Sequence, residues 1–193
     1  MKLSFIAMLM LIILNEIGMA QMCLDVKFIP SGWMGDYSDI TYNANWRNGC
    51  KTDTTCMSEG TCICITYSAL KTNNAGWAGI YWLYENNDLN NEWGSLPGMD
   101  LRGVRRLIFW ARGERGGEAA EFKIGGITND SIQPATSTGT LILTNNWKKY
   151  IIDLANRDLK NINGGFCWVA DSDKNRHGCT FYLSDIQYEY NIR

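Results

Sequence analysis

The stretch Arg105–Ile124, RRLIFWARGERGGEAAEFKI, contains two predicted β-strands and the turn between them. Arg105–Ala111 and Ala120–Ile124 are short runs of aromatic, branched and small apolar residues. Gly113–Gly117 is charged and rich in glycine, a composition that ends regular structure. Short apolar runs bounded by such turn residues are typical of strands. We therefore interpret the segment as a strand, a hairpin tip and a second strand.

The same pattern repeats over most of the chain. Further strands are predicted at Thr61–Ser68, Ala78–Tyr84, Gly139–Leu143, Lys148–Leu154, Gly165–Ala170 and Cys179–Tyr190. Clusters of Gly, Asn, Asp and Ser separate them, and only a short turn near Leu154–Lys160 has helical character. Many short strands with turn residues about every 10 positions favour an all-β fold. We expect a β-sandwich or jelly roll of two antiparallel sheets, in a single domain because no repeat or linker interrupts the pattern.

The first twenty residues are expected to be a signal peptide. Lys2 gives a positive start, Phe5–Leu14 is an apolar run too short to span a bilayer, and Gly18–Ala20 supplies the small residues of a cleavage site. Residues 21–193 would then form one exported domain that no longer associates with the membrane. The signal peptide contains one lysine and one glutamate, so the net charge stays at −2. Without a basic stripe, this charge argues against a nucleic-acid partner.

All seven cysteines lie beyond the predicted signal peptide, and in an exported chain most should form disulfides. Cys62 and Cys64 are two positions apart in a predicted strand, so they share a face and should have different partners. Cys50 and Cys56 lie in a polar loop that could fold back onto that strand.

The two C-terminal cysteines suggest a different kind of link. Cys167 and Cys179 flank a polar loop between two predicted strands, which favours a disulfide that staples a hairpin. An odd number of cysteines leaves one thiol over, and we expect it to be Cys23 because this residue is close to the N-terminus.

The segment Gly76–Gly94 combines aromatic rings with short amides and carboxylates. An aromatic ring can cover the C–H face of a sugar, while amides and acids bond its hydroxyl groups. The candidate ligand-binding residues are Trp77, Tyr81, Trp82, Trp93, Asn86, Asn87, Asp88 and Glu92. The same composition also suits a core strand followed by a solvated loop, and both interpretations remain open at this point.

Alternation divides Ala78–Tyr84 into two apolar faces. Ile80, Trp82 and Tyr84 share one face, whereas Trp77 and Tyr81 share the other. A sandwich strand needs only one apolar face, so a loop, another chain or a ligand must cover the second.

No motif predicts catalysis. His177 is the single histidine and lies in a polar loop, which makes a Ser–His or Cys–His nucleophile pair unexpected. Paired carboxylates for glycoside hydrolysis remain an alternative. The candidates are Glu85, Asp88, Glu92, Glu118 and Glu121, and none belongs to a recognisable acidic motif.

Three segments carry a family resemblance. Leu107–Gly126 (LIFWARGERGGEAAEFKIGG), Leu141–Leu154 (LILTNNWKKYIIDL) and Thr180–Tyr188 (TFYLSDIQY) resemble, in this order, the β-jelly-roll, galactose-binding-like carbohydrate-binding modules of secreted polysaccharide-degrading enzymes. The resemblance implies a non-catalytic sugar-binding domain and, commonly, a structural calcium ion. It places Asp185 in the last strand among the calcium ligands, with Asp36 and Asp39 as plausible partners, although Ser184 stands where the family often has an aspartate.

The sequence is compatible with three functions. The first is a secreted, non-catalytic protein that binds a polysaccharide through aromatic platform residues. The second is a self-assembling structural or adhesive subunit, which a leftover cysteine would favour through an intermolecular bridge. The third is a small glycoside hydrolase or lyase.

Overall fold

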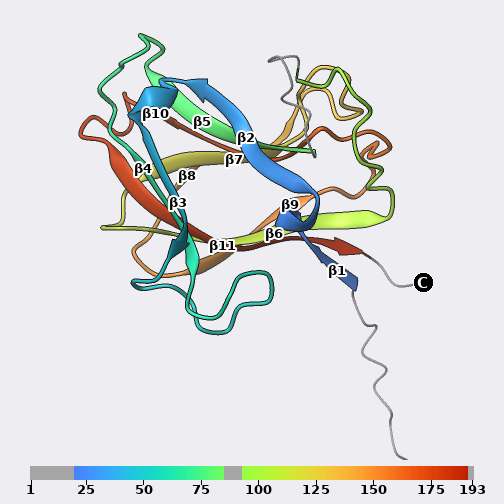
Figure 1. Ribbon diagram of the computed structural model, residues 1–193, viewed down its shortest axis with the longest axis horizontal. Coiled ribbons are helices and arrows are strands. Elements are labelled where there is room, and N and C mark those ends of the chain that lie inside the picture. Colours follow the sequence, from blue (N-terminus) through green and yellow to red (C-terminus); the bar gives the residue numbers. More distant parts are fainter. Residues whose placement is uncertain (1–19, 85–92, 191–193) are drawn as a thin grey trace, which may run out of the picture.

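The computed structural model describes residues 20–84 and 93–190, and within them the chain folds as two stacked antiparallel sheets (Figure 1). Sheet A has the order β3 (Ile40–Trp46), β4 (Cys62–Tyr67), β11 (Cys179–Tyr190), β6 (Val104–Gly113) and β9 (Lys148–Asp153), with β1 (Ala20–Cys23) paired to the end of β11. Sheet B has the order β2 (Phe28–Gly35), β5 (Trp77–Tyr84), β10 (Gly164–Asp171), β7 (Ala119–Ile124) and β8 (Thr136–Ile142). The predicted all-β sandwich is confirmed. Two short 3₁₀ turns, η1 (Leu24–Val26) and η2 (Tyr37–Asp39), flank β2.

The core lies between the sheets and is built from aromatic rings of both. Trp168 and Phe122 from sheet B meet Phe181 from sheet A edge to face, at ring-centre distances of 5.2 and 6.1 Å. These arrangements suit the ring quadrupoles. Burial of each such side chain contributes about 1.5–3 kcal/mol. The division of β5 into two faces is also confirmed, since Ile80 and Trp82 belong to this core.

The expected hairpin at Gly113–Gly117 is wrong. β6 pairs with β11 and β9 in sheet A, whereas β7 pairs with β10 and β8 in sheet B, so the turn crosses from one sheet to the other. The Glu118 carboxylate holds this crossing, because it accepts hydrogen bonds from the backbone N–H groups of Arg115 and Gly116 at 2.7 and 2.9 Å.

The disulfides differ in part from the expected ones. Cys50 is bonded to Cys62, as the idea of a loop folding back onto the strand allows, but Cys23 is bonded to Cys56 and is not left over. The three other cysteines of the described chain are free and buried: Cys64, Cys167 and Cys179.

The predicted Cys167–Cys179 staple is wrong for the same reason as the hairpin. β10 and β11 belong to different sheets, so the loop between them is not a hairpin loop. Cys179 lies in the core between the sheets, and Cys167 lies on the opposite side of sheet B. Burial raises the pKa of the Cys179 thiol to about 12, so this group stays protonated near neutral pH.

No helix among the described residues is long and apolar enough to cross a membrane. The predicted signal peptide lies outside the described residues, apart from Ala20 at the start of β1.

Candidate functional site

The side of sheet B that faces away from the core, here called the outer face of sheet B, carries three of the four candidate aromatic residues, Trp77, Tyr81 and Trp93. The register of the five strands aligns two rows of residues across this face. One row is Met34, Gly79, Val169, Glu121 and Thr140, and the next is Gly32, Tyr81, Cys167, Lys123 and Ser137. The face is therefore apolar over β2, β5 and β10 and polar over β7 and β8.

Gly79 keeps the middle of this face flat. A Cβ atom there would lie 3.1 Å from both the Met34 Cε and the Val169 Cγ2 atoms, and 2.5 Å from the Trp168 carbonyl oxygen. Because Gly79 has no side chain, Met34 and Val169 approach each other over the strand. The depression beside them, between Val169, Glu121 and Lys174, holds only about 30 Å³. The surface is a shallow platform rather than a deep pocket.

One half of the platform is covered by the protein itself. The Tyr81 hydroxyl donates a hydrogen bond to the Gly125 carbonyl at 2.9 Å, and the Trp93 ring meets the Tyr81 ring edge to face at 6.2 Å. Tyr81 is only 7% exposed as a result. Ile127 packs in the same small cluster. The turn that carries Ile127 therefore covers the second apolar face of β5 at Tyr81.

The covering turn is anchored by a buried carboxylate. Asp130 accepts hydrogen bonds from the N–H groups of Ile127 and Gly164 at 3.2 and 3.3 Å, and another from Asn163. Burial raises the pKa of Asp130 in spite of these donors. On the other side, the Asn129 amide donates to the Gly94 carbonyl at 2.9 Å, which fixes the residue beside Trp93.

The other half of the platform is open around Trp77. This indole is 38% exposed and lies opposite Asp171 in the pairing of β5 with β10. Asp171 forms an ion pair with Lys174 at 2.8 Å. Partial burial opposes ionisation of Asp171, but the Lys174 ammonium and nearby backbone N–H groups lower its pKa on balance. An exposed ring therefore stands beside a charged acceptor and a charged donor.

The position of Trp77 is set by the buried Asp36 at the end of β2. Its carboxylate accepts hydrogen bonds from the N–H groups of Asn73, Ala75 and Gly76 at 2.7–3.0 Å. Its own N–H donates to the Trp77 carbonyl at 2.8 Å. Desolvation opposes ionisation, yet these backbone donors lower the pKa of Asp36 on balance. These hydrogen bonds fix the segment that leads into Trp77.

Trp82 is a correction to the predicted set. It points to the core, is 2% exposed, and lies between Tyr42 and Phe166 at ring-centre distances of 6.1 and 5.3 Å. A surface ligand cannot reach it, because alternation places it opposite Trp77 and Tyr81. The other predicted contacts, Asn86, Asn87, Asp88 and Glu92, lie outside the described residues. Of the predicted aromatic residues, Trp77, Tyr81 and Trp93 share one face.

The carboxylates predicted to bind calcium have other partners. Asp39 bonds Thr72, and Asp185 accepts hydrogen bonds from the N–H groups of Thr55 and Cys56 at 2.8 Å each. Together with Asp36, they use their oxygens to hold two different loops. The described part of the chain contains no group of three or more His, Cys, Asp or Glu side chains that could hold a metal ion. Calcium binding stays a prediction.

Two of the carboxylates considered for glycoside hydrolysis lie among the described residues, and both have hydrogen-bond partners. Glu118 holds the turn between the sheets and is buried. Glu121 is on the platform and accepts a hydrogen bond from Ser137. Glu85, Asp88 and Glu92 lie outside the described residues.

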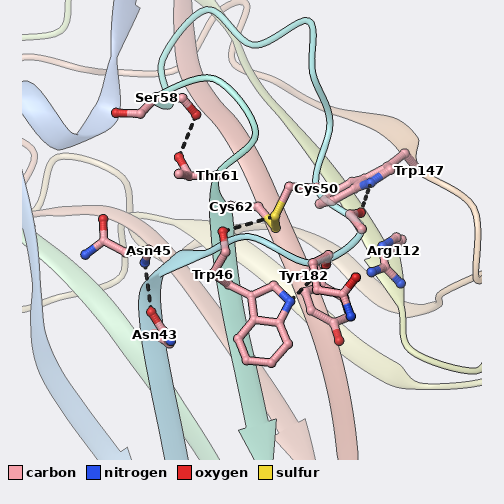
Figure 2. Close-up of a disulfide and its surroundings, with 12 residues drawn as sticks. Asn43, Asn45, Trp46, Cys50, Ser58, Thr61, Cys62, Arg112, Trp147 and Tyr182 are labelled. Carbon is pink, nitrogen blue, oxygen red and sulfur yellow. Dashed lines mark hydrogen bonds between the residues drawn. A yellow bond between two sulfur atoms is a disulfide. The ribbon is translucent and has the colours of Figure 1, made fainter.

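The outer face of sheet A carries a second aromatic cluster, but a disulfide-bonded loop covers it. Figure 2 shows Trp46, Tyr182, Arg112 and Trp147 gathered beside the Cys50–Cys62 bond. The indole N–H groups of Trp46 and Trp147 donate to the Asn48 and Gly49 carbonyls at 2.9 and 3.0 Å. The Arg112 guanidinium lies 3.9 Å from the centre of the Tyr182 ring. On this face, contacts within the protein already use the aromatic side chains.

Trp110 and Trp147 lie outside the core. The core between the sheets contains Trp168 but neither of these two. Trp110 lies on the outer face of sheet A under the Lys51 ammonium, 4.1 Å from the ring centre, and Trp147 packs with the disulfide cluster.

Several platform residues were not predicted. Val169 could have been found, because alternation in Gly165–Ala170 places it opposite the core residue Trp168. Met34 could not, because Pro30 and Gly32 interrupt the pattern of β2. Lys174 lies in a loop whose return over the sheet no local pattern predicts.

Comparisons with known proteins support the fold. No family model and no curated protein matches the sequence. Solved structures do match. A family 30 carbohydrate-binding module matches with a TM-score of 0.55 at 13% identity, over 89% of this chain and 99% of that chain. A family 11 module from Clostridium thermocellum, in complex with a β-1,3-1,4-mixed-linked tetrasaccharide, matches with a TM-score of 0.51 at 12% identity, over 89% and 86%.

A larger protein contains the same fold. An exo-β-agarase matches with a TM-score of 0.58 at 9% identity, over 89% of this chain and 25% of that one. At such identities the likeness shows the fold alone. The chain thus has the β-sandwich fold of carbohydrate-binding modules, which confirms the resemblance carried by the sequence motifs.

Proposed function

We propose that this protein is a secreted, non-catalytic carbohydrate-binding domain that holds a polysaccharide on the open half of the outer face of sheet B. The observation that carries the proposal is Trp77, an indole 38% exposed on the fold of carbohydrate-binding modules. A large exposed apolar group at a rigid position is typical of a binding surface.

The surroundings of Trp77 suit a sugar chain. The ring offers an apolar face for C–H groups, and Asp171 and Lys174 next to it offer an acceptor and a donor for hydroxyl groups. Glu121 and Thr140 continue the polar side across β7 and β8. A shallow platform can take a polymer that extends past both ends, whereas a small enclosed pocket would take only a terminus.

Secretion is supported by cysteine chemistry. Two disulfides, Cys23–Cys56 and Cys50–Cys62, are stable in an oxidising compartment. The predicted signal peptide at residues 1–20 gives an export route that fits them.

The alternatives have less support. Self-assembly was favoured by an unpaired Cys23, but Cys23 is bonded to Cys56, and the free cysteines of the described chain are buried. Hydrolysis needs a carboxylate pair that works on the sugar, and Glu118 is committed to a turn. We therefore favour binding without chemistry.

The test is affinity electrophoresis or pull-down with a panel of insoluble and soluble polysaccharides, using Trp77→Ala and a matched control. Trp33 is the control, because it is also 38% exposed but lies at the edge between the sheets, against Tyr42. Loss of a buried ring contact costs about 1.5–3 kcal/mol, so binding should weaken about tenfold to a hundredfold in Trp77→Ala.

Trp33→Ala should bind as the wild type does. Equal weakening in both variants would reject the platform as the site. Binding to no polysaccharide in the panel would reject the proposed function, and release of sugar from any of them would restore the hydrolase alternative.

A further inference from the structure

A cavity of about 310 Å³ lies at the end of the sandwich where β6 begins and β9 ends. These strands are neighbours in sheet A (Figure 1). Their pairing places Arg106 opposite Asp153. The cavity is not part of the platform on sheet B. Three arginines line it, Arg102, Arg105 and Arg157, and none of the described acidic side chains does.

The frame of the cavity is built from hydrogen-bonded backbone. The Leu154 N–H donates to the Arg105 carbonyl at 2.9 Å, and the Arg157 N–H donates to the Leu154 carbonyl at 3.1 Å. The Leu101 N–H donates to the Leu159 carbonyl at 2.8 Å. Leu154 and Leu159 are buried and form an apolar floor. The segments that carry the three arginines are therefore tied together before any ligand arrives.

The charges of the cavity are only partly neutralised. Asp100 accepts hydrogen bonds from the Nε and Nη2 groups of Arg102 and holds that guanidinium in place. These bonds lower the pKa of Asp100 to about 2, so this pair is neutral overall at physiological pH. Arg105 and Arg157 have no carboxylate within ion-pair distance among residues 20–84 and 93–190. Two of the three arginines that line the cavity thus have no ion-pair partner in the described chain.

We propose that this cavity binds an oxyanion, the sulfate or carboxylate substituent of an acidic polysaccharide, through the guanidinium groups of Arg105 and Arg157. Guanidinium groups present planar pairs of N–H donors that match the oxygens of such anions. Like charges around one cavity repel, and an anion between them removes that repulsion. The apolar floor excludes water from one side of the contact. The oxyanion chemistry stands alone, and only its placement on a polysaccharide rests on the proposed function.

The direct test is a titration of the full chain with inorganic sulfate, followed by calorimetry or NMR. The variant is Arg105→Gln/Arg157→Gln, and the control is Arg176→Gln, an exposed arginine in the loop between β10 and β11. We expect the double variant to lose at least tenfold in sulfate affinity and the control to lose none. Wild-type affinity should fall as salt is raised, because the contact is between charges. Thermal melting checks that both variants are folded.

The source of the anion is tested with a sulfated polysaccharide, a uronic-acid polysaccharide and a neutral one. Binding of either acidic polymer at least tenfold more tightly than free sulfate, lost in the double variant, would support a glycan substituent. Tight binding of free sulfate alone would support the oxyanion site and reject the glycan as its source. Equal binding by the double variant and the control, or sulfate affinity weaker than about 10 mM in the wild type, would overturn the site.

The two proposals fail separately. If Trp77→Ala binds every polysaccharide normally but the double arginine variant loses sulfate, the platform is wrong and the cavity stands. If the reverse holds, the cavity is wrong and the platform stands.

Discussion

The outer faces of the two sheets are both rich in aromatic side chains, yet the protein treats them differently. On sheet A, the indole N–H groups of Trp46 and Trp147 are bonded to a loop, and Arg112 lies over the Tyr182 ring (Figure 2). On sheet B, Trp93 and the turn at Ile127 cover Tyr81, but Trp77 stays open. The difference shows that aromatic composition does not identify a binding face. The proposed site therefore rests on Trp77, which the protein leaves uncovered on the outer face of sheet B.

The two faces also differ in how they are stabilised. The loop between β3 and β4 runs beneath sheet A in Figure 1 and is fixed there by two disulfides. Near Trp77 the chain is held instead by hydrogen bonds from backbone N–H groups to the Asp36 carboxylate. We infer that sheet A carries covalent stabilisation and that sheet B carries the exposed site, a separation that mutations can test.

Removal of a disulfide should destabilise the protein most. Disulfides stabilise by limiting the unfolded chain, so replacing both cysteines by serine should cost about 3 kcal/mol for Cys50–Cys62 and about 4 kcal/mol for Cys23–Cys56. The order follows their sequence separations of 12 and 33 residues. Denaturant unfolding measures the cost. Polysaccharide binding, measured below the melting temperature, should be unchanged, and a loss of binding would show that the two faces are not separate.

A smaller effect is expected for Tyr81→Phe. The change removes the donor to the buried Gly125 carbonyl and should lower the free energy of unfolding by about 1–2 kcal/mol. Because Trp93 covers this ring, polysaccharide binding should stay within twofold of the wild type. The contrary result, weaker binding with unchanged stability, would mean that the ligand reaches Tyr81 and that the covered half belongs to the site.

The smallest effect is a change in acid sensitivity for Asp36→Asn. A carboxyl group whose pKa is lowered by folding stabilises the native state above its ordinary pKa of 3.8, and this contribution is lost as pH falls through the lowered value. The wild type should therefore be more stable than Asp36→Asn near pH 6, and the difference should shrink below pH 3.8. Melting temperatures over a pH series measure it. A difference that does not depend on pH would contradict the role of the charge.

The sequence predicted the strands of the second half of the chain well, because each is a local pattern. The alternation in Ala78–Tyr84 also predicted which side of β5 faces the core, since side-chain direction follows from period 2 alone. No strand was predicted from the sequence at β1, β2 or β3. In β2, Pro30 and Gly32 break the apolar pattern, and the strand forms because β5 pairs with it.

The disulfides and the site needed information that no local pattern holds. A glycine-rich turn such as Gly113–Gly117 can close a hairpin or cross between sheets, and the crossing changed the expected partner of Cys167. Exposure is equally non-local. Alternation along the strand places Trp77 and Tyr81 on the same side. They differ in exposure only because Trp93 and the turn at Ile127 pack onto Tyr81.

The proposed function requires that a polysaccharide contacts the open half of sheet B at Trp77. Its most direct test is a ¹⁵N NMR titration that follows the indole N–H signals, assigned by single Trp→Phe variants, as the polysaccharide that binds best is added. We expect a concentration-dependent shift of the Trp77 signal, with the Trp46 and Trp147 signals unchanged. Shifts of the Trp46 and Trp147 signals with an unchanged Trp77 signal would contradict it and place the ligand on sheet A.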